Sequence, residues 1–144
     1  MTDSWPSFDG LDRDSKHVRK IRKLLETAKV SFLSEEASKI RRALDWTVRT
    51  RSKRLTCSID ASKFASGHNS VVVELKFSDS TSWIARIRLP SKAAPNEEVE
   101  RSLLSEIITL RLVKSKTSIP VPEVYGFDSS LPNTFGYRYL LMCF

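Results

Sequence analysis

Three features of the sequence could together take part in binding a phosphate group. Residues 64–72, FASGHNSVV, carry one glycine among small polar residues, which would let backbone N–H groups approach a phosphate closely. Arg86 lies in an apolar segment, where a guanidinium needs an acidic partner or extends to solvent. Glu106 lies mid-way along a predicted helix, beside its apolar stripe. Each feature alone is also typical of ordinary structure: a turn, an outward arginine and a solvated glutamate.

The first two features depend on predicted strands. β-Branched and alternating residues predict strands at residues 55–59, 70–77, 83–89 and 136–144, and two prolines favour extended chain in residues 117–128. The glycine-containing stretch then connects the first two strands. Alternation in the third strand places Ile84, Arg86 and Arg88 on one face. The segment Ser78 to Ser82 has the composition of a hairpin turn, so these strands are expected to be antiparallel.

The third feature depends on the strongest helix signal in the chain, residues 96–114. Asn96 is a suitable N-cap, and glutamates in the first turn favour the positive end of the helix dipole. The apolar stripe of this helix is Val99, Leu103, Ile107 and Leu110.

Two amphipathic helices are expected before the sheet. From Ser15, apolar residues recur every three or four positions, with bases on the other side: Val18, Ile21, Leu24, Leu25 and Ala28. Ser34 is a plausible N-cap for a second helix, which we expect to continue to the basic residues 49–54. The order is therefore helix, helix, three strands, helix, two strands.

Residues of about 55 to 144 resemble the N-terminal lobe of the aminoglycoside phosphotransferase and choline kinase type of kinase-like fold, particularly its large fungal group. Four ordered strings carry the resemblance: FASGHNSVVVELKFSDSTSWIARI, SEIITLRLV, TSIPVPEVYGFD and NTFGYRYLLMCF. It implies an α+β lobe, an antiparallel five-stranded sheet with one packed helix, which the predicted helical hairpin precedes. The expected domains are a basic helical extension at 1–55 and the kinase-like lobe at 56–144.

The resemblance also implies how a nucleotide would be held. A loop covers the phosphates, a strand base contacts them, and a helix acid fixes that base. The implied residues are Ser66, Gly67, His68 and Asn69 in the loop, Arg86 as base, Glu106 as acid, and Leu141, Met142, Cys143 and Phe144 at the start of the hinge beside adenine. Two residues depart from the family pattern. Arg86 replaces the lysine usual in protein kinases, and Cys143 stands where relatives commonly carry an acid.

The expected ligand is therefore ATP, but the sequence contains no histidine-glycine-aspartate catalytic string. We expect an ATP-binding small lobe that is inactive alone and looks truncated at the hinge. A catalytic lobe or partner protein would supply the general base and the Mg²⁺ site.

Charge suggests an alternative. Net charge is +7, of which +6 belongs to residues 1–55. The basic helices could form a noncatalytic module that binds an acidic partner or membrane surface. Nucleic acid is disfavoured, because only Phe32 and Trp46 interrupt residues 16–54 as aromatics for stacking.

Composition indicates which broad class of protein the chain belongs to. Apolar residues make up 40% and charged residues 28%, as in ordinary globular proteins. No apolar run approaches the roughly 18 residues of a transmembrane helix, and the acidic N-terminus does not resemble a signal or transit peptide, so we expect a cytoplasmic protein. Two cysteines and two histidines lack the spacing of a zinc site.

Overall fold

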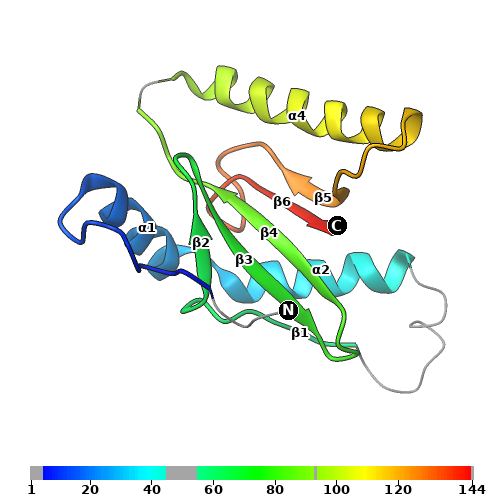
Figure 1. Cartoon of the computed structure of the whole chain (residues 1–144), viewed down its shortest axis with the longest axis horizontal. Coiled ribbons are helices and arrows are strands. Elements are labelled where there is room, and N and C mark those ends of the chain that lie inside the picture. The colour runs from blue at the N-terminus through cyan, green and yellow to red at the C-terminus, as the bar shows by residue number, and fades with distance from the viewer. Residues whose placement is uncertain (1–4, 45–54, 93, 144) are drawn as a thin grey trace.

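The computed structural model describes residues 5–44, 55–92 and 94–143, and this part of the chain forms an α+β fold (Figure 1). Its elements are α1 (Lys16–Thr27), α2 (Val30–Leu44), β1 (Cys57–Ser58), β2 (Phe64–Ser66), β3 (Ser70–Phe77), β4 (Ser82–Arg88), α4 (Asn96–Lys116), β5 (Glu123–Asp128) and β6 (Tyr139–Cys143). None of the helices in these ranges is long and apolar enough to cross a membrane.

The strands form one antiparallel sheet of six strands, ordered β1-β3-β4-β6-β5, with β2 also paired to β3. The prediction of five strands is therefore wrong by one. Residues 64–66, expected to lie in a loop, form β2 through the pairing of Phe64 with Val73 and Ser66 with Val71. A three-residue strand has no periodicity of its own to detect, and its structure depends on the partner strand.

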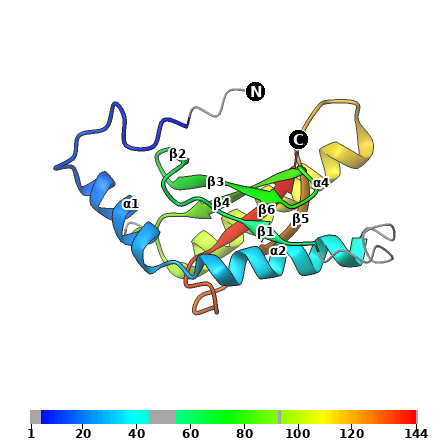
Figure 2. The ribbon, with the colours of Figure 1, turned by 90° about the horizontal axis from the view of Figure 1, so that it is seen from below.

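Helices cover both faces of the sheet, as the two views in Figures 1 and 2 show. The inward residues of β3 and β4 alternate as predicted, and they pack with α1 and α2 in the larger hydrophobic cluster. On the opposite face, α4 packs over a smaller cluster made of Leu103, Ile107, Val124, Leu140 and Met142. The strand residues Ile84, Arg86 and Arg88 alternate with the buried residues of β4, which confirms their predicted shared face.

The N-terminal helices belong to the same core as the sheet. Ser15 caps α1 by accepting a hydrogen bond from the Val18 N–H at 3.1 Å. α2 begins at Val30, so the prediction of Ser34 as its N-cap is wrong; the Ser34 hydroxyl lies within the helix and donates to the Ser31 carbonyl. The helix starts earlier because Leu33 is already part of its buried face. The predicted basic end of this helix, residues 49–54, lies outside the described residues.

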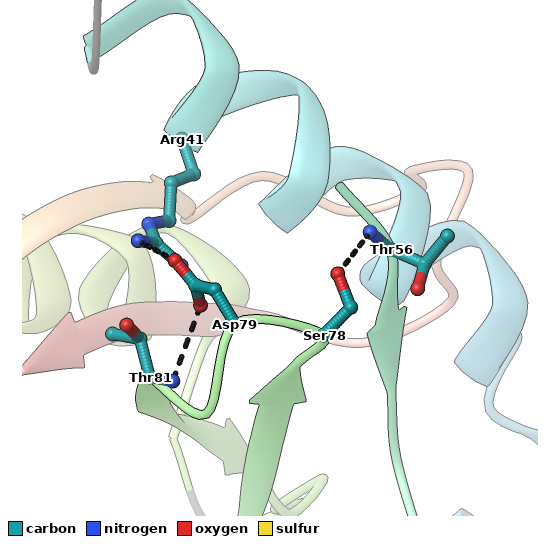
Figure 3. A network of polar contacts seen from close by, with 5 residues as sticks. All are labelled: Arg41, Thr56, Ser78, Asp79 and Thr81. Atoms are coloured by element: carbon teal, nitrogen blue, oxygen red, sulfur yellow. Dashed lines mark hydrogen bonds and ion pairs between the residues drawn. The ribbon is translucent and has the colours of Figure 1, made fainter. Parts of the chain in front are cut away.

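A network of hydrogen bonds connects α2 to the hairpin turn between β3 and β4 (Figure 3). The Arg41 guanidinium donates to both carboxylate oxygens of Asp79, at 2.8 and 2.5 Å, and lies over the Phe77 ring. Asp79 in turn accepts from the Thr81 N–H at 3.2 Å. Hydrogen bonding to Arg41 holds the pKa of Asp79 well below its ordinary value. Helix position is thereby tied to the turn that joins two central strands.

The start of α4 differs from the prediction. Pro95 occupies the N-cap position, Asn96 is already helical, and no side chain of the described residues caps the helix. Buried Arg138 donates to the Asn96 carbonyl at 3.3 Å and to the Ser129 carbonyl at 2.7 Å. The first turn of α4 is therefore fastened to the segment that leads into β6.

Candidate functional site

A hollow of about 270 Å³ opens between the β2–β3 turn, β4 and the first half of α4. It is lined by His68, Asn69, Ser70, Arg86, Arg88, Leu103, Glu106 and Leu140. The polar residues come from three separate parts of the chain, while two leucines form the apolar part of the wall. The site is thus a small polar hollow on the sheet face that α4 covers.

Arg86 and Glu106 form an ion pair in this hollow, which confirms the predicted contact between strand and helix. The register places Arg86 between Val72 of β3 and Leu140 of β6, so its side chain leaves the centre of the sheet. Glu106 follows Leu103 by one helical turn, and burial of Leu103 turns this side of α4 toward the sheet. The side chains are 29% and 37% exposed, so a ligand in the hollow can reach the pair.

The β2–β3 turn forms the rim of the hollow. The Gly67 N–H donates to the Ser70 carbonyl at 2.9 Å, and the Leu89 N–H donates to the Asn69 carbonyl at 2.8 Å, which fastens the turn to the end of β4. No acceptor among the described residues takes the backbone N–H of His68 or Asn69. These two groups remain able to donate to a bound anion.

Gly67 is not required by the geometry of its own turn. Its φ lies outside the left-handed region, and a Cβ atom there would meet only the Ser70 hydroxyl, at 3.9 Å. The fold would therefore accept alanine. A reason to have glycine here would be close approach of a ligand to the turn backbone.

Arg88 is a site residue that the sequence analysis did not select. It pairs in register with Ser70 and lines the hollow two residues beyond Arg86, and among the described residues its guanidinium forms no ion pair. Its predicted position on the same face as Arg86 was the signal that could have identified it. The hollow therefore carries two guanidinium groups against one carboxylate, a balance that favours an anion.

The remaining predicted site residues lie elsewhere. Ser66 lies in β2 and pairs with Val71 of β3, and Gly67 lies in the turn but does not line the hollow. Met142 is buried against α4, flanked in register by Ile84 and Val124. Cys143 faces the opposite side of the sheet, where its thiol donates to the Ser82 carbonyl at 3.7 Å.

The predicted hinge therefore does not meet the hollow through its side chains. Leu140 lines the hollow, and Met142 lies two residues further along the same face of β6, about 7 Å away at the rise of a strand. Leu141 is in the core of the other face, and Phe144 lies outside the described residues.

The described residues contain no group of three or more histidine, cysteine or acidic side chains placed to hold a metal ion. Among the described residues, Glu106 is the one carboxylate that lines the hollow, and Arg86 engages it. The arrangement can neutralise and orient an anion, but it offers no unengaged carboxylate as a general base.

No family model, curated protein or solved structure matches the chain.

Proposed function

We propose that this chain is the ATP-binding small lobe of a small-molecule kinase of the aminoglycoside phosphotransferase type. The observation that carries the proposal is the Arg86–Glu106 ion pair. The pair lines a hollow whose rim is the glycine-containing turn. A turn over the phosphates, a strand base and a helix acid are the parts with which kinase small lobes hold a nucleotide.

Each part has a role that follows from its chemistry. Arg86 contacts the α and β phosphates, for which a guanidinium can supply two parallel N–H donors. Glu106 holds that guanidinium in place before the nucleotide arrives, which lowers the ordering cost of binding. The N–H groups of His68 and Asn69 donate to phosphate oxygens, and Arg88 adds a second cation at the open side.

Adenine would lie toward the end of β6. Met142 is paired with both Ile84 of β4 and Val124 of β5, whereas the pairing of β6 with β4 does not extend to Cys143, so the purine would contact the chain at Cys143. The small lobe thereby provides one wall of the nucleotide site. A catalytic lobe, in the same polypeptide or in a partner, would supply the base, the Mg²⁺ ligands and the second wall.

Calorimetric titration with ATP tests the binding step. Because one wall alone buries little of the nucleotide, we expect a dissociation constant in the millimolar range, a binding free energy of about −4 kcal/mol. Inorganic triphosphate should compete with ATP, since the hollow recognises phosphate. Failure of both ligands to bind at tens of millimolar would refute the proposal.

Phosphotransfer is tested by fusing a catalytic lobe of the same family after residue 144. We expect no transfer to aminoglycosides or choline by the chain itself, and transfer by the fusion. Replacing Arg86 by Met should lower turnover of the fusion by about tenfold or more. Equal activity of a correctly folded fusion with and without Arg86 would contradict the assigned role.

A further inference from the structure

A second, larger cavity lies away from the proposed nucleotide site. This groove of about 870 Å³ runs between α1 on one side and two segments, residues 90–92 and 136–137, on the other. Its basic lining residues are Lys16, Arg19, Lys20 and Lys23 from α1, and Lys92 from the segment after β4. We call this cavity the basic groove.

The five basic side chains of the groove are not neutralised by acidic side chains of the described residues. All five are exposed, no acidic side chain lines the cavity, and within the described residues none of the five forms an ion pair. The α1 residues follow one another at positions 16, 19, 20 and 23, which places them along one side of the helix. Five uncompensated cations around one concavity repel one another, and an anionic ligand would relieve that repulsion.

The walls of the groove are built into the fold. The opposite side of α1 is buried in the core through Val18, Ile21 and Leu24. At the end of the helix, the hydroxyls of Thr27 and Tyr137 lie 2.5 Å apart in a hydrogen bond, and the Lys29 N–H donates to the Phe135 carbonyl. These contacts tie the C-terminal end of α1 to the segment that forms one side of the groove.

The shape of the groove selects among anionic ligands. α1 cannot insert into a bilayer, because its apolar side is already buried, and a planar surface does not fill a concave groove. Single-stranded nucleic acid binds through exposed aromatic rings, whereas the groove's aromatic residue, Tyr137, is 9% exposed. An extended polypeptide needs neither a planar surface nor exposed aromatic rings in order to bind.

The geometry points to the basic groove as a docking site for an extended acidic polypeptide segment of a partner protein. Residues 16 to 23 span about 10 Å along the helix axis, the length of about three extended residues, so a short run of glutamate or aspartate can meet several bases at once. The site shares no residue with the nucleotide hollow and does not depend on the function proposed for it. Arg41, by contrast, is engaged by Asp79 and is not part of this surface.

Fluorescence anisotropy with a labelled deca-glutamate peptide tests the proposal. We expect binding that weakens as salt is raised from about 50 mM to 300 mM, because exposed charges are screened. The variant Lys16→Glu/Lys20→Glu/Lys23→Glu should bind at least about tenfold more weakly, since each exposed pair contributes and each new carboxylate repels. Absence of binding by the wild-type chain, or affinity equal to that for an uncharged peptide, would overturn the proposal.

A matched control separates the groove from net charge. The variant Lys39→Glu/Lys76→Glu/Lys116→Glu changes the net charge equally at exposed positions outside the groove. It should retain affinity within about twofold, and an equal loss in both variants would refute a defined site. The neutral variant Lys16→Gln/Lys20→Gln/Lys23→Gln, checked by thermal unfolding, should also lose affinity without loss of fold. Tighter binding of anionic vesicles or a single-stranded oligonucleotide, lost in the same groove variant, would overturn the choice of a polypeptide.

Discussion

Replacing Arg86 by Met separates a ligand-binding role from a structural one. Methionine keeps a long unbranched side chain beside Val72 and Leu140 but removes the charge that Glu106 engages. With the paired side chains 29% and 37% exposed, solvent screens the interaction. We therefore expect a loss of at most about 1 kcal/mol in the free energy of unfolding, which is a fall of at most about 4 °C in Tm for a chain of this size.

The expected effect on nucleotide binding is larger. A charge-assisted hydrogen bond to phosphate contributes about 1.5–3 kcal/mol, so Arg86→Met should weaken ATP binding by about ten- to a hundredfold. Two-dimensional amide NMR titration suits weak binding, because the Gly67 and His68 amide signals report directly on the rim of the hollow. In the variant these signals should no longer approach saturation at ATP concentrations that saturate the wild-type chain.

The matched control is Arg101→Met, which removes an exposed arginine from α4 outside the hollow. It should change neither the titration nor Tm by a measurable amount. If Arg86→Met lowered Tm while leaving the titration unchanged, the ion pair would be purely structural and the nucleotide assignment would be refuted.

Three further substitutions test other parts of the structure. Gly67→Ala should leave Tm unchanged or slightly raised, because its turn is not left-handed and the nearest atom is 3.9 Å away, yet it should weaken ATP binding in the same NMR titration. Asp79→Asn should lower the unfolding free energy by about 1–2 kcal/mol at pH 7 in urea denaturation. Because pairing with Arg41 depresses the pKa of Asp79 in the folded chain, this contribution is complete above the ordinary value of 3.8 and is lost as pH falls toward the depressed one. The stability gap between wild type and Asp79→Asn should therefore narrow in acid, and a gap that widened would contradict the assignment. Arg138→Met should cost about 1–3 kcal/mol in the same assay, since it removes the donors to the Ser129 and Asn96 carbonyls from a buried position, and an unchanged urea midpoint would contradict that account.

The sequence alone determined the elements whose signal is contained in their own residues. Period-two alternation located β3 and β4 to within a residue or two, and it placed Arg86 and Arg88 on one face. A three- and four-residue repeat located α1 and α4 together with their buried residues. These signals are reliable because each segment must present one apolar face to the core, whatever lies on the other side of it.

The pairing of Arg86 with Glu106 was predicted from the resemblance to kinase-like lobes, because the periodicity of each segment does not predict contacts between segments. A strand residue and a helix residue twenty positions apart meet only if the helix packs at one particular height along the strand. That height is set by Leu103 and Ile107 packing on Leu140 and Met142, contacts between segments far apart in the chain.

The existence of β2, the residue at which α2 begins and the lining of both cavities depend on tertiary structure and could not be predicted from the sequence. β2 is a strand because β3 offers it backbone partners. Lys92 faces the α1 bases because the segment after β4 passes that helix, and Arg88 lines the hollow because the β2–β3 turn is bonded to Leu89. A cavity is enclosed by residues from several segments, so its composition depends on long-range packing and leaves no pattern in any one of them.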